Sequence, residues 1–429
     1  MPPSERRLID DCFLHDKDRL RHADALAILK ARVAPVVGTE TVPLARAAGR
    51  RIAQTVTAPR AVPAADNAAV DGYAFAHADH AETGGFFPLS QRIAAGHPSD
   101  TALPPGTAAR IFTGALMPQG ADTVAMQEDC ETHVQDGLDF VIVPQGLKPG
   151  ANRRRAGEDL AAGAGLVTPG QRLRPQDLAA IASTGTGEVA VYAPVRVALV
   201  STGDELRRPG APLPEGGVYD SNHFLLRALL EEAGAAITDL GILADDSSLV
   251  HDTLREASAT HDMILTTGGA SRGEEDHLVT ALDALGTRHM WQLAIKPGRP
   301  MNFGQIGDCV TLGLPGNPVA AMVCFLLYVR PVLAVLGGGP FPEPRRFQVP
   351  AAFSVPKKKP DRREFYRGTL DTDGKGRTVV RKFNRDGSGL ITGLREADGL
   401  IEIPEEATQV RDGDLVDFLP FSELGLTAG

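Results

Sequence analysis

Short apolar runs alternate with amphipathic segments in the second half of the chain, from residue 195 to residue 336. The apolar runs have the length of buried strands, and the segments between them show the 3.6-residue periodicity of helices. This alternation predicts a parallel α/β sheet whose strand carboxyl ends face a ligand cleft. Strands are expected at 195–200, 236–243, 263–267 and 290–295, and helices at 222–233, 248–258, 278–285 and 318–336.

The pattern changes on both sides of this α/β region. Residues 19–37 and 175–182 have helical spacing, whereas 61–162 carries short β-like runs between Gly and Pro turns. Such runs without long amphipathic helices predict a small, mostly β domain. A Gly- and Pro-rich linker at 337–344 precedes further short strands, which predict a second β domain.

Composition narrows the class of protein. A chain of 429 residues is too long for one core, so several domains are expected. Its formal net charge of −10 argues against a general nucleic-acid binder, whose binding face would be basic. The four cysteines are scattered without a CxxC pair, which favours reduced thiols over a zinc site or a disulfide framework. The N-terminus has no apolar signal core, and Arg330 and Pro331 interrupt the most apolar helix, so a cytoplasmic protein without a membrane span is expected.

Three strand-to-helix loops carry the candidate chemistry. Residues 266–277 follow an apolar strand, contain glycines and precede a helix, which is how backbone N–H groups are presented to an anion. Residues 201–206 and 313–318 repeat the arrangement. The loops at 201–206 and 313–318 are each also explained by helix capping, and Asn317 with Pro318 suits an ordinary helix start. Three such loops within about 120 residues favour a shared ligand cleft.

Charged residues cluster near the same strand ends. Asp245-Asp246 and the acidic run at 274–276 predict carboxylates beside the anion loops, a pattern that favours Mg²⁺ with phosphate oxygens. Asp220-Ser-Asn222 opens a helix and is explained as well by capping. Lys296 and Arg299, held between prolines, are suited to oxyanions. Segments 66–74, 153–159, 361–368 and 386–389 add further charges, while Lys357 to Lys359 is expected to be a solvated loop.

The motifs together resemble those of one family. In order along the chain they are DNAAVDGYA at 66–74, RIFTGA at 110–115, RAGED at 155–159, STGDEL at 201–206, TGGAS at 267–271, KPGRP at 296–300 and GLPGNP at 313–318. This combination is similar to that of the molybdopterin molybdenumtransferases, which include bacterial MoeA and the E domain of gephyrin. The resemblance spans nearly the whole chain.

The resemblance implies a multidomain α/β plus β fold and an elongated homodimer. The implied reaction takes adenylyl-molybdopterin and molybdate, releases AMP and inserts molybdenum at the dithiolene with a divalent cation, Mg²⁺. Transient contacts with an adenylylating partner and with apo-molybdoenzymes would follow. The implied domains are an N-terminal helix at 1–40, a linking domain at 41–62 and 163–194, an inserted β domain at 63–162, a MogA-like molybdopterin-binding α/β domain at 195–340 and a C-terminal β barrel at 344–429.

The resemblance also implies roles for individual residues. Phosphate and substrate contacts would come from Asp220, Ser221, Asn222, Thr267, Gly268, Gly269, Ser271, Gly316 and Asn317. Glu205, Asp245 and Asp276 match acidic positions tied to activity, and Asp245 and Asp276 would hold the metal. Molybdate would meet Lys296, Arg362 and Ser388, and Pro297 and Arg299 would also contact substrate. Asp66, Thr113 and Asp159 would reach the cleft of the partner subunit.

Three positions depart from the family pattern. Gln292 stands where many relatives carry lysine, which removes one cation from an oxyanion pocket. Arg299 replaces a usual lysine and keeps its charge, and Ala68 replaces a usual serine. Two alternatives therefore stay open beside the insertase. One is a molybdopterin adenylyltransferase, which shares the α/β domain, and the other is a non-catalytic cofactor carrier or scaffold, toward which only Gln292 leans.

Overall fold

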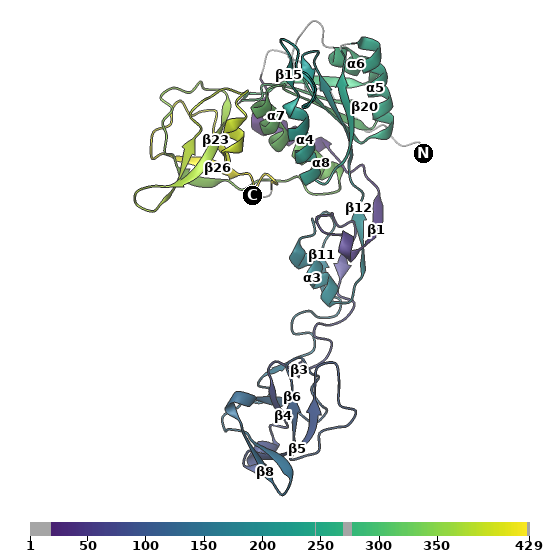
Figure 1. Ribbon diagram of the computed structural model, residues 1–429, viewed down its shortest axis with the longest axis vertical. Helices are drawn as coiled ribbons and strands as arrows, with labels where there is room; N and C mark the ends of the chain where they lie inside the picture. Colours follow the sequence, from purple (N-terminus) through teal and green to yellow (C-terminus); the bar gives the residue numbers. More distant parts are fainter. Residues whose placement is uncertain (1–18, 245, 269–276, 427–429) are drawn as a thin grey trace.

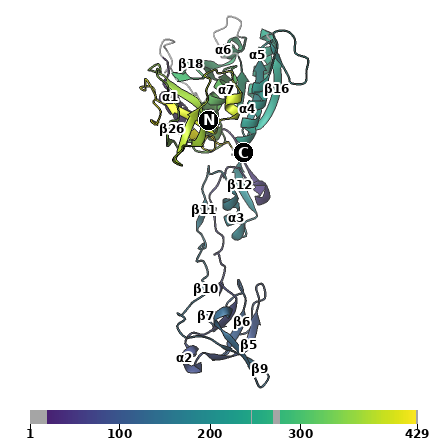
Figure 2. The ribbon, with the colours of Figure 1, turned by 60° about the vertical axis from the view of Figure 1, so that its left-hand side comes forward.

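The chain forms an elongated molecule of four lobes (Figure 1). The computed structural model describes residues 19–244, 246–268 and 277–426. An α/β lobe and a C-terminal lobe lie side by side at one end, and a narrow middle lobe separates them from a distal lobe at the other end. Figure 2 shows extended chain segments running between the middle and distal lobes. The distal lobe is thus an insertion that lies away from the α/β and C-terminal lobes.

The α/β lobe is built on one six-stranded sheet. Its strands are β13 (Arg196–Thr202), β16 (Ala236–Leu243), β17 (Met263–Thr267), β18 (Thr287–Gln292), β20 (Pro300–Ile306) and β21 (Cys309–Leu314). In space their order is β16-β13-β17-β21-β20-β18. β16, β13, β17 and β21 run parallel to one another, whereas β20 is antiparallel to β21 and β18 is antiparallel to β20. The sequence pattern did not predict β20 or β21, so the sheet is mixed and larger than expected.

Helices cover both faces of this sheet. They are α1 (His22–Arg32), α4 (Ser221–Glu232), α5 (Ser247–Thr260), α6 (His277–Leu285), α7 (Pro318–Cys324) and α8 (Arg330–Leu336). On β13, Val197 and Leu199 join the core under α1, α4, α7 and α8, whereas Ala198 and Val200 join the core under α5 and α6. Successive residues of a strand face opposite sides. A strand buried on both sides therefore reads as the uninterrupted apolar run seen in the sequence.

The most apolar helix is an interior element. It spans Pro318–Leu336, with the π-helical segment η3 (Phe325–Val329) between α7 and α8. In the described residues it is the one helix long and apolar enough to cross a membrane, but 94% of its most apolar window is buried inside the protein. Its composition is therefore explained by the core, as the sequence predicted.

The middle lobe is a small unit made from two separate stretches of chain. Its elements are β1 (Thr39–Pro43), η1 (Leu44–Arg46), β2 (Val56–Thr57), β11 (Gly165–Val167), α3 (Pro175–Ser183) and β12 (Glu188–Tyr192). β1 pairs with β12 and β2 with β11, both antiparallel. Ile52, Ile181 and Val191 are fully buried in its own core. The two chain stretches are thus held together by strand pairing and by this core.

The distal lobe is the small β domain predicted by the short runs. Its elements are β3 (Asn67–Ala68), β4 (Gly72–Phe75), α2 (Asp79–Thr83), β5 (Phe86–Ile93), β6 (Ala108–Ile111), β7 (Thr123–Met126), η2 (Gln127–Asp129), β8 (Glu131–Gln135), β9 (Leu138–Ile142) and β10 (Arg153–Arg154). Six of the strands form one sheet with the order β7-β4-β6-β5-β9-β8, and β3 pairs with β10. The lobe packs its own cores around Phe75, Phe87 and Ile111.

The C-terminal lobe is a second β unit. Its elements are β22 (Phe347–Pro350), β23 (Arg363–Thr372), β24 (Thr378–Lys382), α9 (Thr392–Arg395), β25 (Gly399–Ile403) and β26 (Leu415–Pro420). A short strand from the α/β lobe, β19 (Ile295–Lys296), joins its sheet beside β23. The strand expected at 290–295 is therefore divided between two sheets. A bridge between Ala351 and Val380 brings the start of the lobe to β24, and closure into a barrel stays a prediction.

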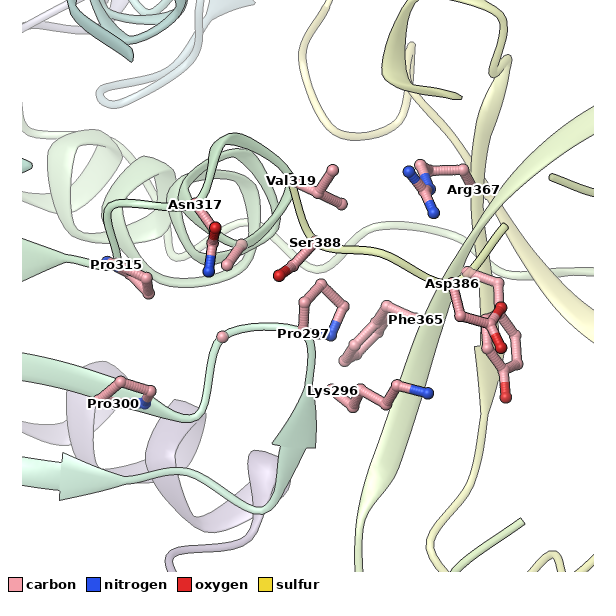
Figure 3. Close-up of a pocket in the computed structure, with 13 residues that line it drawn as sticks. Lys296, Pro297, Pro300, Pro315, Asn317, Val319, Phe365, Arg367, Asp386 and Ser388 are labelled. Atoms are coloured by element: carbon pink, nitrogen blue, oxygen red, sulfur yellow. The ribbon is translucent and has the colours of Figure 1, made fainter. Parts of the chain in front are cut away.

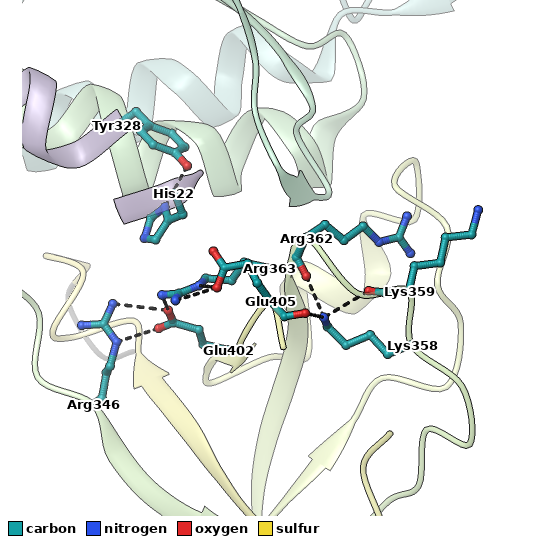
Figure 4. Close-up of polar contacts among 9 residues, drawn as sticks. All are labelled: His22, Tyr328, Arg346, Lys358, Lys359, Arg362, Arg363, Glu402 and Glu405. Atoms are coloured by element: carbon teal, nitrogen blue, oxygen red, sulfur yellow. Dashed lines mark hydrogen bonds and ion pairs between the residues drawn. The ribbon is translucent and has the colours of Figure 1, made fainter. Parts of the chain in front are cut away.

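Buried polar contacts hold α1 against η3 and brace the C-terminal lobe internally (Figure 4). The imidazole Nδ1 of His22 lies 2.8 Å from the Tyr328 hydroxyl, and burial lowers the pKa of His22 to about 3, so the ring is neutral. Arg363 pairs with Glu402 and Glu405 across neighbouring chain segments. Lys358 is only 3% exposed and donates to backbone carbonyls. The expectation that Lys357 to Lys359 is solvated throughout is therefore wrong for Lys358.

Candidate functional site

The ends of the parallel strands meet at one edge of the α/β sheet, as predicted. β13 leads to the turn at 203–205, β17 to Gly268, and β21 to Pro315 and Gly316. The Asn222 side chain joins two of these loops, because its Nδ2 donates to Thr267 Oγ1 at 2.9 Å and to the Gly316 carbonyl at 2.7 Å. Asn222 is 7% exposed, and its Oδ1 is a buried acceptor without a hydrogen-bond partner in the described residues. One buried amide thus sets the spacing of the loops.

Glycine is required where β17 ends. Gly268 has a φ of +90°, and a Cβ there would lie 2.5 Å from the Thr202 carbonyl oxygen. The backbone therefore passes too close to its neighbour for any side chain, and its conformation is strained for other residues. This close approach brings the ends of β13 and β17 together at the start of the predicted anion loop.

Asp220 is engaged by the protein itself. Its Oδ1 accepts a hydrogen bond from the His223 backbone N–H at 3.0 Å, which caps α4. Its Oδ2 lies 3.2 Å from Arg208 Nη1, and Arg208 also pairs with Asp239 at 2.9 Å. The capping interpretation of Asp220 is confirmed. Its role is to fix the beginning of α4, so that Asn222 reaches the loops.

A cavity lies where the α/β and C-terminal lobes meet (Figure 3). Its volume is about 240 Å³. Lys296, Pro297 and Asn317 contribute from the α/β lobe, and Arg367, Asp386 and Ser388 contribute from the C-terminal lobe. Asn317 occupies the cap position of α7 but makes no capping hydrogen bond with its side chain. Because its amide is not used by the helix, it is available to a ligand at this junction.

Strand pairing places a cluster of charges beside this cavity. Lys296 lies opposite Glu364 in the β19–β23 register, and their charged atoms are 3.8 Å apart. Glu364 is 2% exposed, accepts from Arg362 Nε at 2.7 Å and also accepts from the Tyr366 hydroxyl. Burial, followed by the hydrogen bond to this carboxylate and its charge, raises the pKa of Tyr366. One buried carboxylate therefore orients two cations and a phenol.

Two ammonium groups flank the Tyr366 ring. Lys296 Nζ lies 5.9 Å from the ring centroid and Lys382 Nζ lies 5.1 Å from it. Lys382 also pairs with Asp386 at 2.6 Å. Burial raises the pKa of Asp386, but the hydrogen bond from Lys382 and the charges of Lys382, Lys296 and Arg367 outweigh it and hold that pKa below its usual value. The cavity thus carries an excess of positive charge with one ionised carboxylate, which suits an oxyanion.

The structure brings several of the predicted residues together and separates others. Lys296, Pro297, Asn317 and Ser388 line the junction cavity. Arg362 lies beside it but directs its guanidinium to Glu364. The remaining α/β residues sit at the strand ends: Ser221 begins α4, Glu205 is exposed before β14 (Leu206–Arg207), and Arg299 is exposed and contributes its carbonyl to the Leu293 N–H.

The predicted residues of the inserted domain are far from this cleft within one chain (Figure 1). Asp66 accepts from the Ala156 N–H at 2.8 Å, and Thr113 donates its hydroxyl to Asp71 at 2.6 Å. Asp159 is exposed beside the bridge between Val62 and Leu160. Hydrogen bonds from Thr113 lower the pKa of Asp71. Asp66, Thr113 and Asp159 could therefore reach a cleft of this kind only in a second chain.

Four predicted residues, Asp245, Gly269, Ser271 and Asp276, lie outside the described residues. Within the described part of the chain, no group of three or more His, Cys, Asp or Glu side chains could hold a metal ion. The two residues that the resemblance assigns to a metal, Asp245 and Asp276, are among the four outside the described part of the chain. Gln292 ends β18 and does not line the junction cavity.

Sequence reasoning missed the inner part of the charge cluster. Glu364, Tyr366 and Arg367 lay in a segment noted only for its charges, and Lys382 was not singled out. The available signal was alternation along β23, which puts Glu364 and Tyr366 on the same face of the strand. A carboxylate and a phenol that are buried on one face need a cation as a partner. The pairing of β19 with β23 supplies that cation, and a contact between such distant segments has no local pattern.

Comparison with known proteins covers nearly the whole chain. Family models describe residues 20–185 as the MoeA N-terminal region (domain I and II), 198–335 as a probable molybdopterin binding domain, and 348–421 as the MoeA C-terminal region (domain IV). A molybdopterin molybdenumtransferase of Haemophilus influenzae is 35% identical over 90% of this chain and 95% of its own length. One from Bacillus subtilis is 31% identical over 90% of each.

A solved structure shares the fold. The molybdopterin biosynthesis MoeA protein of Pyrococcus horikoshii superimposes with a TM-score of 0.78 at 29% identity. The match covers 94% of this chain and 99% of that one. All four lobes therefore have counterparts in one solved chain.

Proposed function

The chain belongs to the molybdopterin molybdenumtransferase family, and on that premise we propose that it inserts molybdenum in molybdenum-cofactor biosynthesis. It is a transferase that acts on molybdopterin. Adenylyl-molybdopterin and molybdate are the proposed substrates, and the molybdenum cofactor and AMP are the products. The observation that carries the proposal is Asn317, which belongs to the loop after β21 and also lines the junction cavity.

The two halves of the cleft are suited to two halves of the reaction. The backbone turns at Gly268 and Gly316, spaced by Asn222, would receive the phosphate groups of the pterin substrate, since exposed N–H groups at helix starts favour anions. The junction cavity would receive molybdate beside Lys296 and Ser388. Asn317 lies between them. The protein's part is to hold two anions together and offset their charge, without a covalent protein intermediate.

The inserted domain and the metal enter as further parts of the proposal. We place Asp66, Thr113 and Asp159 at the cleft of a partner subunit in a cytoplasmic homodimer, because the distal lobe extends away from its own cleft. Mg²⁺ would be held by Asp245 and Asp276, with Glu205 nearby. We also propose the domain boundaries that the sequence implies, with the linking domain corresponding to the middle lobe.

The decisive experiment measures AMP release from adenylyl-molybdopterin with and without molybdate at fixed Mg²⁺. Release that depends on molybdate, followed by activation of an apo-molybdoenzyme, is expected. ATP-dependent adenylylation of molybdopterin without molybdate would instead indicate an adenylyltransferase. Tight binding of the pterin without release would indicate a carrier. Asp276→Ala should abolish release while the circular dichroism spectrum is unchanged.

A further inference from the structure

A second set of cations lies away from the cleft, where the middle lobe meets the α/β lobe. Arg51 and Arg172 belong to the middle lobe, and Arg330 begins α8 in the α/β lobe. All three line one cavity of about 240 Å³. Arg51 and Arg172 also line an adjoining cavity of about 60 Å³. The mechanism proposed above uses none of these residues.

The three guanidinium groups are largely unsatisfied. Arg51 Nη1 donates to the Gly170 carbonyl at 3.0 Å, and Arg172 donates to the carbonyls of Gly49 and Glu232, both at 3.0 Å. The Arg330 guanidinium makes no hydrogen bond or ion pair to the residues that the structure describes. Each guanidinium carries five N–H donors. Most of the donors around this cavity are therefore open to a ligand.

The charge of the cluster is not balanced locally. In the described part of the chain, Glu232 is the one carboxylate residue that lines the cavity. Glu423 acts on Arg330 from nearby but is itself paired with Arg345 at 2.5 Å. Burial, then the charge of Arg172, lowers the pKa of both Arg51 and Arg330. Three cations facing one carboxylate leave an excess of positive charge that an anion would relieve.

The backbone holds these arginines in place. The Arg51 guanidinium lies against Gly339, where a Cβ would clash with it. A Cβ at Gly425 would lie 2.5 Å from Arg330 Nε, and Gly425 has a φ of +83°. Side chains packed this closely are fixed before any ligand arrives, which lowers the entropy cost of binding. The rest of the cavity wall is apolar: Leu229, Phe325, Leu326, Leu333, Leu424 and Leu426.

We propose that Arg51, Arg172 and Arg330 form a binding site for a small organic oxyanion, a phosphate or carboxylate group on an apolar body. The guanidinium groups would bind the oxyanion bidentately, and the leucine-rich wall would cover the apolar body. Because the arginines come from two lobes, the bound anion fastens the middle lobe to the α/β lobe. It thereby limits the swing of the distal lobe, which the middle lobe carries.

The probe is phenyl phosphate, and its binding affinity is measured by calorimetric titration at constant ionic strength. Inorganic phosphate and benzoate are titrated in the same way for comparison. Phenyl phosphate should bind at least tenfold more tightly than inorganic phosphate, since only it uses the apolar wall. Benzoate shows whether a carboxylate suffices. Arg330→Gln should weaken phenyl phosphate binding by roughly tenfold, the loss of a charge-assisted contact. Arg255→Gln, on the other face of the sheet, is the matched control and should change nothing.

The same titration in Lys296→Gln separates this site from the proposed substrate cleft, because binding at the arginine cluster should persist there. Arg172→Gln, an exposed residue, tests the site without disturbing the core. The proposal is overturned if wild type fails to bind phenyl phosphate at millimolar concentration, or if neither Arg330→Gln nor Arg172→Gln weakens binding. Molybdate-dependent AMP release by Arg330→Gln is expected to remain, so the two proposals fail separately.

Discussion

The two sides of the cleft are built in different ways. The α/β side consists of backbone turns at Gly268 and Gly316 that one buried amide, Asn222, holds at a fixed spacing. The C-terminal side consists of ionised side chains arranged around the buried Glu364. Geometry governs the first side and charge governs the second. Substitutions on the α/β side should therefore alter shape and affinity, whereas those on the C-terminal side should alter charge balance and transfer.

The largest expected effect follows removal of the buried carboxylate. Glu364→Ala leaves Arg362 and Lys296 without their partner, and breaking one side of a buried ion pair costs about 3–5 kcal/mol. Urea denaturation should show that the free energy of unfolding of the C-terminal lobe falls by that amount. Glu396→Ala, an exposed carboxylate in the same lobe, is the control and should stay within about 0.5 kcal/mol. A loss under 1 kcal/mol for Glu364→Ala would contradict the central role of this carboxylate.

Lys296→Gln tests the charge side directly. It removes the cation that projects into the junction cavity while keeping a side chain of similar length. We expect kcat/KM for molybdate-dependent AMP release to fall about 100-fold, as for loss of a preorganised electrostatic contact. Lys375→Gln, in the turn between β23 and β24, should leave the rate unchanged. Equal rates in the two variants would place molybdate elsewhere.

The geometric side is tested by a pair of asparagines. Asn222→Ala removes two hydrogen bonds and should lower both the free energy of unfolding and molybdopterin affinity by about 2 kcal/mol. Asn317→Ala removes an amide that caps nothing, so it should slow AMP release without a change in stability. Thermal unfolding and pterin titration distinguish the two. If Asn317→Ala destabilises the protein as much as Asn222→Ala does, the distinction between spacing and ligand contact is wrong.

This division also explains what the sequence could predict. Turns that need glycine and strands buried on both faces leave local patterns, so 236–243 and 263–267 were located without error. The family motifs then extended the interpretation to individual residues. Asn222 was expected near the ligand, although its hydrogen bonds to two loops were not.

The charge side was harder to predict because it depends on pairing between distant segments. Lys296 meets Glu364 only because β19 leaves the α/β sheet and joins β23, and the sequence pattern assigned 290–295 to a single strand. Strands β20 and β21 were missed because their glycines and polar residues break the apolar pattern. Lys358 was expected in solvent, but three backbone carbonyls accept its hydrogen bonds and permit burial.

The smallest expected effect concerns the pH dependence of the charge side. The pKa of Asp386 is lowered in the folded state, chiefly by Lys382 against the opposing effect of burial. A carboxyl group whose pKa is lower in the folded state stabilises the fold at any pH above its pKa in the unfolded state. That stabilisation is lost as the pH falls through the pKa of the folded state. Wild type and Asp386→Asn should therefore differ in thermal stability near neutral pH and converge as the pH falls below about 4. The pair is partly exposed, so the gap should be small and should shrink further in salt. A stability difference that stays constant from neutral to acid pH would show that Asp386 acts through packing and not through its charge.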